Sequence, residues 1–309
     1  MKKISIVTPC YNEEENVEPL YHAIKSVMEK QPSYEYEHIY IDNASKDETV
    51  SILRRLAAQD RHVKVILNAR NFGHIRSPYY GLLQAYGDAV VILASDFQEP
   101  PELITEFIEN WESGKKVVMG VKTESNESPV FYFFRTLYYR VLHALSDTDL
   151  IEHATGFGLY DQDIICLLRS LDDPYPYFRG LIAELGHERA LVPFSQPQRI
   201  RGVTKNNFFT LYDMAMLGLT SYTRVPLRIA TIVGAVIGAI SFLIGIIYLI
   251  YKLIDWQNFS LGLAPLVVGI FFIGSVQLVF LGILGEYVGA ILTQVQRRPL
   301  VVEKERINF

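Results

Sequence analysis

Short apolar runs alternate with amphipathic stretches along the first part of the chain. Runs rich in β-type residues predict strands at Lys3–Thr8, His38–Ile41, Val63–Leu67, Ala89–Ala94 and Lys116–Val121. Between them, apolar positions recur at the i, i+3, i+4 spacing of helices, at Asn16–Lys30, Val50–Leu56, Ser77–Tyr86 and after Pro100-Pro101. This alternation predicts an α/β fold, with a mostly parallel, Rossmann-like sheet covered by helices on both faces.

Other helices are predicted from weaker signals. Ser45-Lys46-Asp47-Glu48 has the S-x-x-E form of a capping box, which predicts the start of the second helix. Further helices are expected over Phe131–Ser146 and from Gln162, and Gln196–Lys205 is expected to be a polar, basic loop.

Two later stretches, Ile229–Tyr251 and Leu261–Leu284, contain no charged side chain. Each is longer than the about 20 apolar residues that cross a bilayer. Soluble helices of this length almost always have a polar face, so two transmembrane helices are favoured over two buried core helices. Asn207–Tyr222 has a broad apolar face directly before the first span. It is expected to lie on the membrane surface, with an ordinary core helix as the alternative.

These features divide the chain into four expected parts. They are a cytoplasmic catalytic domain at 1–205, a juxtamembrane amphipathic helix at 206–225, two transmembrane helices at 226–290 and a cytoplasmic tail at 291–309.

The distribution of charge predicts the topology. Arg224 and Arg228 precede the first span, and four basic residues follow the second, whereas Lys252–Ser260 between the spans carries one Lys and one Asp. The positive-inside rule therefore places both chain ends in the cytoplasm, and the apolar run after Met1 is too short for a signal peptide.

The two cysteines have no disulfide or zinc spacing. The net charge of −5 argues against nucleic-acid binding.

Polar segments follow the first, second and fourth predicted strands, and contain Glu13, Asp42 and Asp96 respectively. In an open α/β sheet, ligands bind beyond the carboxyl ends of the strands, where these segments should converge. One such carboxylate alone could equally be a helix cap. No P-loop or G-x-G-x-x-G motif is present at the expected position. Carboxylates suggest hydrogen bonds to sugar hydroxyls and a hard cation, Mg²⁺ or Mn²⁺, that also binds substrate phosphates. The ligand expected is thus a nucleotide-sugar.

Four motifs in order carry a resemblance to a known family. They are Val7–Asn16 (V-P-x-Y-N-E-x-x-N), Asp42–Thr49 (D-D-G-S-x-D-x-T), Arg70–His74 (R-N-x-G) and the metal motif at Ser95–Glu102. With them, the chain resembles the inverting family 2 glycosyltransferases of GT-A fold, and among these the polyprenyl-phosphate sugar transferases, such as bactoprenol glucosyltransferases and dolichol-phosphate mannose synthases.

The resemblance implies roles for individual residues. Donor binding is expected at Pro9, Tyr11, Glu13, Asp42, Asn43, Asn71, Ser95 and Asp96, and metal binding at Asp96 and Gln98. Acceptor binding is expected at Arg135, Arg140, Asp161, Arg179, Arg201 and Lys205. Asp96, Arg201 and Lys205 are the expected catalytic residues, although Arg201 and Lys205 could instead anchor the chain to anionic lipid.

The chain departs from the family pattern at two positions. Ala94 replaces the first Asp of the D-x-D, and Asn43 replaces the second Asp of D-D-G-S. The first change removes an expected metal ligand, and the second removes a charge near the donor.

The expected function is inverting transfer of one hexose to undecaprenyl (polyprenyl) phosphate, by a protein of the bacterial inner membrane. Similarity to bacterial glucosyl carriers favours glucose from UDP-glucose over mannose or aminoarabinose. A processive synthase is disfavoured because neither Trp111 nor Trp256 follows an Arg in a Q-x-x-R-W motif. A non-catalytic scaffold that binds nucleotide-sugars remains the alternative of another class.

Gly234-x-x-x-Gly238 and Gly285-x-x-x-Gly289 predict close helix pairing, within one chain or in a homo-oligomer.

Overall fold

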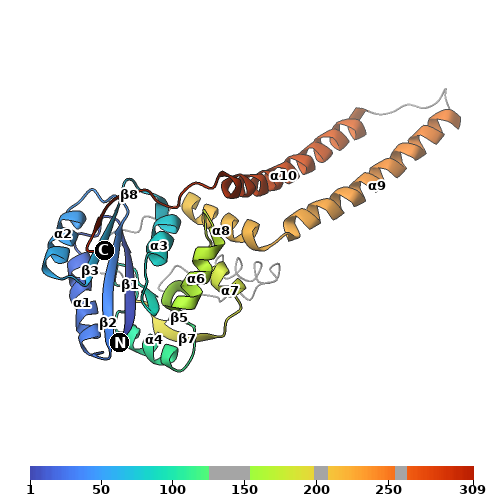
Figure 1. The fold of residues 1–309 in the computed structure, drawn as a ribbon. Helices are drawn as coiled ribbons and strands as arrows, with labels where there is room; N and C mark the ends of the chain where they lie inside the picture. The colour runs from blue at the N-terminus through green and yellow to red at the C-terminus, as the bar shows by residue number, and fades with distance from the viewer. Residues whose placement is uncertain (125–153, 198–207, 255–262) are drawn as a thin grey trace.

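The computed structural model describes residues 1–124, 154–197, 208–254 and 263–309. An eight-stranded sheet, in the order β7-β5-β6-β4-β1-β2-β3-β8, forms the centre of a domain from which a long helical hairpin extends (Figure 1). The helix expected at 131–146 and the loop expected at 196–205 lie wholly or largely outside the described residues.

The alternation of strands and helices in the first half is confirmed. It runs β1 (Lys2–Cys10), α1 (Val17–Glu29), β2 (Tyr34–Asp42), α2 (Thr49–Gln59), β3 (Val63–Asn68), α3 (Gly73–Leu83), β4 (Ala89–Ile92), α4 (Leu103–Glu112) and β5 (Val117–Glu124). After the undescribed segment follow β6 (Ala154–Asp161), α6 (Gln162–Leu171), α7 (Phe178–Glu184) and β7 (Arg189–Ser195). Of these four, only α6 was predicted.

The strand order places a switch in winding direction between β1 and β4. From β1 the chain moves outward to β2 and β3, and then returns to the other side of β1 as β4, with all three pairings parallel. Beyond β4 the sheet becomes mixed, because β6 lies antiparallel between β4 and β5. The predicted parallel pairing is therefore confirmed for β1 to β4.

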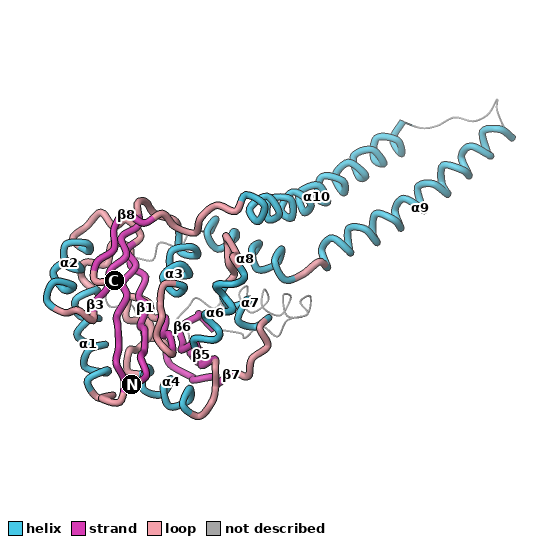
Figure 2. Tube along the Cα trace, in the orientation of Figure 1, coloured by secondary structure: helices cyan, strands magenta, loops and turns pink. Residues whose placement is uncertain are grey.

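Helices cover both faces of the sheet, as the pattern predicted (Figure 2). On one face, Ile4 and Ile6 of β1 pack with apolar residues of α1 and α4, such as Leu20 and Phe107. On the other face, Val7 packs with residues of α3, α6 and α7. Successive side chains of a strand point to opposite faces, so one strand contributes to both cores.

The segment expected to be a cytoplasmic tail contains a strand that the sequence pattern did not predict. β8 (Glu303–Ile307) pairs antiparallel with β3 at the edge of the sheet. The Asn308 amide donates to the carbonyls of Ala57 (2.7 Å) and Val63 (2.8 Å), and Arg54 forms an ion pair with Glu305. The sequence Glu-Lys-Glu-Arg-Ile has no apolar alternation, which explains why no strand was predicted; charged residues of this kind are common on edge strands.

The hairpin consists of α9 (Val225–Ile254) and α10 (Leu263–Gln296). The most apolar 18-residue windows within Val225–Ile254 and Leu266–Gln296 have mean hydropathies of 2.6 and 2.5, and both windows are entirely unburied in the chain. Both helices are long and apolar enough to cross a membrane. α10 continues past the boundary expected at residue 290. A Cβ added at Gly234, Gly238, Gly285 or Gly289 would meet no atom within 4 Å, so these glycines do not mediate close pairing between the described parts of α9 and α10.

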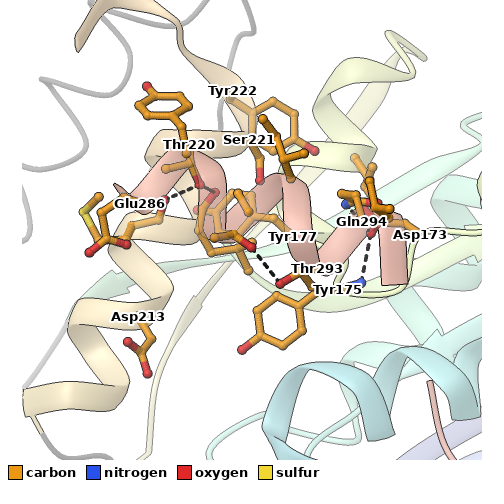
Figure 3. Close-up of a pocket in the computed structure, with 18 of the residues that line it drawn as sticks. Asp173, Tyr175, Tyr177, Asp213, Thr220, Ser221, Tyr222, Glu286, Thr293 and Gln294 are labelled. Atoms are coloured by element: carbon orange, nitrogen blue, oxygen red, sulfur yellow. Dashed lines mark hydrogen bonds between the residues drawn. The ribbon is translucent and has the colours of Figure 1, made fainter. Parts of the chain in front are cut away.

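Helix α8 (Phe208–Tyr222) joins the domain to the hairpin, and α10 packs against it. The Tyr212 hydroxyl donates to Glu286 at 3.1 Å, and the buried Tyr287 hydroxyl donates to the Thr223 carbonyl at 2.7 Å. Nearer the sheet, the Gln294 amide donates to Asp173 at 3.0 Å (Figure 3). These bonds hold the base of the hairpin against the domain.

The buried side chain of His38 in β2 generates a prediction about acid stability. Its Nε2 lies 2.9 Å from Thr8 Oγ1, and burial lowers its pKa from 6.5 to about 3. Below pH ~6.5 the unfolded chain therefore binds a proton that the folded chain does not, and the free energy of unfolding falls as the pH drops. Between pH ~7 and ~5 this site should cost about 2 kcal/mol. His38→Gln keeps a hydrogen-bonding group near Thr8 but cannot titrate, so its stability should fall less over this range.

Denaturant unfolding of the detergent-solubilised chain, followed by tryptophan fluorescence at several pH values, measures this difference. His22 is exposed, and His22→Gln serves as the control that keeps the wild-type slope. Equal slopes for His38→Gln and the wild type would contradict the prediction.

Candidate active site

Three residues with left-handed backbone conformation lie just beyond the carboxyl ends of the parallel strands. Asn12 (φ 54°), Ala44 (φ 62°) and Phe97 (φ 57°) follow β1, β2 and β4 respectively. For residues other than glycine this conformation costs roughly 1–2 kcal/mol each, and such strain concentrates at functional sites. The carboxyl ends of β1 and β4 flank the switch in winding direction, where open α/β sheets bind ligands.

The loops after β1 and β2 are tied together by hydrogen bonds. The backbone N–H of Asn12 donates to the Ser45 hydroxyl at 2.8 Å, and the N–H of Lys46 donates to Asn12 Oδ1 at 2.8 Å. Ser45 itself donates to Asp42, through its hydroxyl and through its N–H (3.0 Å). The predicted capping box is therefore wrong: α2 begins at Thr49, and Ser45 binds the loop rather than the helix.

Asp42 is only 1% exposed, and both of its carboxylate oxygens accept bonds from Ser45. Burial raises the pKa of this carboxyl above its ordinary value, and the Ser45 bonds oppose that shift. Glu13, in the facing loop, accepts a bond from the Asn16 amide at 2.6 Å, while its N–H donates to Thr49. These carboxylates hold the shape of the edge at which a donor would bind.

Asn43 connects the loop after β2 to the loop after β3. Its amide nitrogen donates to Asn71 Oδ1 (3.0 Å) and to the Gly73 carbonyl (3.1 Å). Its oxygen accepts from the Phe72 N–H (2.9 Å) and from the Asn68 amide (3.1 Å). Four bonds on one buried amide fix the R-N-x-G segment at the site. An Asp at this position, as in the family pattern, could not make the two donor bonds.

The turn after β4 holds the remaining residues of the expected donor and metal sites. Ser95 is buried, and Asp96 Oδ1 accepts from the Gln98 N–H at 3.2 Å. The Glu99 carboxylate folds back and accepts a bond from the backbone N–H of Ala94 at 2.7 Å. Sequence reasoning gave Glu99 no role, although it lies in the metal motif.

These residues fit a hard cation that also binds substrate. Asp96, Gln98 and Glu99 offer the oxygen ligands that Mg²⁺ and Mn²⁺ prefer. Among the described residues, however, no three His, Cys, Asp or Glu side chains lie close enough to hold a metal by themselves. Mg²⁺ sites of this kind are completed by water and by substrate phosphates.

A cavity of about 270 Å³ opens beside this turn. Its lining includes Pro9 and Ala94 at the strand ends, Glu99 in the turn, His74 of α3, Arg179 of α7 and Met214 of α8. Pro9 and Arg179 were predicted site residues, whereas His74, Glu99 and Met214 were not. Asp96 and Gln98 lie on the same turn but not in the cavity wall.

One expected acceptor residue is misplaced. Asp161 pairs with Ala89, the first residue of β4. It therefore lies at the amino ends of the parallel strands, away from the candidate site at their carboxyl ends. It caps α6 through the Asp163 N–H at 2.9 Å and accepts from the Trp111 indole at 2.7 Å. Asp161 is therefore structural, and its assignment to the acceptor site is wrong. Arg135, Arg140, Arg201 and Lys205 lie outside the described residues.

A larger cavity, of about 630 Å³, lies between α7, α8 and α10 (Figure 3). Asp173, Glu184, Asp213 and Glu286 contribute to its wall, which contains no Lys or Arg among the described residues. Four carboxylates without a cation are unsuited to a phosphate ligand. The smaller cavity at the strand ends is therefore the candidate active site.

The bonds of Asn43 predict the effect of the family residue at this position. Asn43→Asp places a carboxylate against Asn71 Oδ1 and the Gly73 carbonyl, so the free energy of unfolding should fall by about 1–3 kcal/mol. Nucleotide-sugar affinity should fall as well, because the Asn71–Gly73 segment loses its support. Denaturant unfolding and calorimetric titration measure the two effects. Asn110→Asp in α4 is the control, because its amide donates only one exposed hydrogen bond, to the Glu106 carbonyl at 2.8 Å. Equal stability of the two variants would refute this role for Asn43.

Comparison with known proteins gives two family matches. Residues 5–167 match glycosyl transferase family 2, and residues 225–291 match the GtrB C-terminal hairpin. The first match covers β1 to β5 and ends within α6, and the second covers nearly all of α9 and α10.

Curated relatives match over nearly the full length. The SfII prophage-derived bactoprenol glucosyl transferase of Shigella flexneri is 33% identical over 304 residues, which cover 98% of each chain. The glycosyltransferase YkcC of Bacillus subtilis is 33% identical, over 96% of this chain and 92% of its own.

Among solved structures, the mannosyltransferase PcManGT of Pyrobaculum calidifontis, in complex with GDP-Man and Mn²⁺, has a TM-score of 0.45 at 18% identity, covering 71% of this chain and 62% of its own. S. aureus TarS 1-349 with UDP-GlcNAc has a TM-score of 0.42 at 17% identity, over 71% and 67%. From the family matches and the full-length relatives, we conclude that this chain is a membrane-associated glycosyltransferase that belongs to glycosyl transferase family 2 and carries a GtrB C-terminal hairpin.

Proposed function

We propose that the protein transfers a single glucose from UDP-glucose to undecaprenyl phosphate, with inversion at the anomeric carbon, on the cytoplasmic face of the bacterial inner membrane. One observation carries this proposal: the cavity at the strand ends is bounded by Pro9 and Ala94 on the sheet side and by Met214 of α8 on the other. Helix α8 leads directly into the membrane hairpin, so a soluble donor and a membrane-bound acceptor can reach one cavity.

The names of the full-length relatives support glucose and a polyprenyl acceptor, because several are bactoprenol glucosyl transferases. The donor side of the site is expected to include Pro9, Tyr11, Glu13, Asn43 and Asn71. A divalent cation held by the turn after β4 would offset charge on the leaving diphosphate.

The acceptor phosphate needs little activation. A phosphate monoester has a second pKa near ~6 and is mostly dianionic at neutral pH, so it is already a nucleophile. The chain must instead bind and orient it, which favours guanidinium groups. Arg179 is the described arginine that lines the cavity, on α7 next to α8. We assign it to the acceptor phosphate, together with Arg201 and Lys205, which lie outside the described residues.

The hairpin is proposed to span the membrane with both chain ends in the cytoplasm. The basic residues at its two ends support this orientation. The open glycine faces of α9 and α10 support close packing between chains, and we propose a homo-oligomer on this basis.

The proposed reaction predicts label transfer from one donor to lipid. Purified protein in detergent, with undecaprenyl phosphate and Mg²⁺ or Mn²⁺, should move label from UDP-glucose into the lipid phase, and EDTA should abolish the transfer. Labelled UDP-galactose, GDP-mannose and a UDP-aminoarabinose test the alternative sugars. A protein that binds a nucleotide-sugar but transfers none of these would instead fit the scaffold function.

Arg179→Ala should separate acceptor use from donor use. Loss of charge-assisted hydrogen bonds to the phosphate should raise the KM for undecaprenyl phosphate about 10- to 100-fold, with the donor KM within about twofold. Arg179→Lys should lie between, because it keeps the charge but not the planar guanidinium. Steady-state kinetics in both substrates measure this, with exposed Arg61→Ala as the control. Equal losses for donor and acceptor would count against this role.

A further inference from the structure

A third cavity, with a basic wall, lies where the segment after α10 meets the loop after β3. Its volume is about 380 Å³, and Arg70, Arg76 and Arg298 line it, with no acid among its described wall residues. The larger cavity beside α10 has the opposite character, with four carboxylates and no described Lys or Arg. This arginine pocket shares none of its described wall residues with the candidate active site, so it is a separate site.

The backbone brings Arg298 to the arginine pocket from the end of the hairpin. Directly after α10, Arg297 has a left-handed backbone conformation (φ 43°), which ends the helix. Four residues later Val301 is buried, and the Val302 carbonyl accepts a hydrogen bond from the Ala69 N–H at 2.9 Å. The segment that leads from α10 to β8 is therefore fixed beside the loop after β3 (Figure 1).

Aromatic rings hold the other two arginines. The guanidinium carbon of Arg70 lies 4.0 Å from the centroid of the Phe72 ring, and Arg70 also donates to the Asn71 carbonyl at 3.0 Å. The guanidinium carbon of Arg76 lies 5.2 Å from the centroid of the Tyr175 ring. Contacts with an aromatic face orient a guanidinium without neutralising it. The positive charge of both groups therefore remains available to a ligand.

The guanidinium groups lack acidic partners. Among the described residues, no ion pair involves Arg70, Arg76 or Arg298. The Nε of Arg76 is also buried without a hydrogen-bond partner in the described part of the chain. An unpaired buried donor is unfavourable, and like charges around one cavity repel one another. An anion bound between the three arginines would offset this repulsion.

A phosphate group is the anion that these side chains fit best. Each guanidinium presents planar pairs of N–H donors that match phosphate oxygens. A volume of about 380 Å³ lies within the range of about 300–1,000 Å³ that is usual for small-molecule sites. The phosphate can therefore carry an attached organic group.

We propose that Arg70, Arg76 and Arg298 form a second anion site, which binds a phosphate group carried by an anionic membrane lipid or by a soluble phosphate compound. The bound phosphate joins the segment after the hairpin to the catalytic domain, because Arg298 belongs to the first and the other two arginines to the second. The site does not depend on which sugar or acceptor the enzyme uses.

Thermal unfolding of the full-length protein in an uncharged detergent tests the site, because a ligand of the folded chain raises the unfolding temperature. The probes are inorganic phosphate, dioctanoyl phosphatidylglycerol and, as the control for acyl chains, dioctanoyl phosphatidylcholine. Phosphate or phosphatidylglycerol should stabilise the wild type saturably, and phosphatidylcholine should not. A response to phosphatidylglycerol alone identifies a lipid headgroup as the source, whereas a response to inorganic phosphate identifies a soluble one.

Two variants locate the response. Arg76→Gln and Arg298→Gln each remove one guanidinium, and each should raise the concentration for half-maximal stabilisation at least about tenfold. Exposed Arg61→Gln is the matched control and should stay within about twofold of the wild type. Arg179→Ala, which removes the arginine of the candidate active site, should also keep the response.

Arg298 is exposed, so Arg298→Gln remains a valid test if Arg76→Gln, with its buried Nε, unfolds. The inference is overturned if neither phosphate nor phosphatidylglycerol stabilises the wild type, or if Arg298→Gln responds as the wild type does. Loss of the response in Arg179→Ala would place the phosphate in the candidate active site instead. Sugar transfer is not measured, so the site can fail this test while the proposed function holds.

Discussion

Parallel pairing of β1 with two neighbours is the constraint on which the site depends. β1 pairs with β2 from Lys2–Tyr34 to Cys10–Asp42, and with β4 from Ile4–Ala89 to Val7–Ile92. Three strands that are distant in sequence therefore end at the same edge. Each continues into a loop that contains a residue of left-handed backbone conformation. Glu13 and Asp96 lie in these loops, and Asp42 lies directly before one of them. The side chains of the candidate active site come together because of this register.

The connection to the membrane has two separate attachments to this sheet. One leads through α8 into α9, and the other returns from α10 to β8, which pairs with β3. Hydrogen bonds from Tyr212, Tyr287 and Gln294 add contacts at the base of the hairpin. Two covalent paths restrict rotation of the catalytic domain relative to the hairpin more than a single linker would. Such a restriction suits an enzyme whose acceptor is confined to a surface.

The two departures from the family pattern have different structural consequences. Asn43 uses both hydrogen-bonding ends of its amide to fix the Asn71–Gly73 segment, which a carboxylate could not do. At Ala94 the loss of a carboxylate coincides with the approach of Glu99 to the same backbone position. In both places, the effect of the substitution depends on hydrogen-bonding partners from elsewhere in the chain.

The sequence by itself determined the features that depend on local patterns. Strand and helix periodicity predicted β1 to β5 and α1 to α4, the uncharged runs predicted α9 and α10, and four motifs in order indicated the family. The tertiary structure alone decided features that depend on pairing between distant segments. Asp161 lies at the end of the strands that is remote from the candidate site because β6 runs antiparallel to β4. The charged residues of β8 form a strand only because β3 has an unpaired side with which they can pair. Ser45 and Glu99 likewise bind backbone or side-chain groups that their sequence neighbours do not reveal. Periodicity reports which face of an element is buried, whereas direction, register and the partners of polar groups arise only when the whole sheet is assembled.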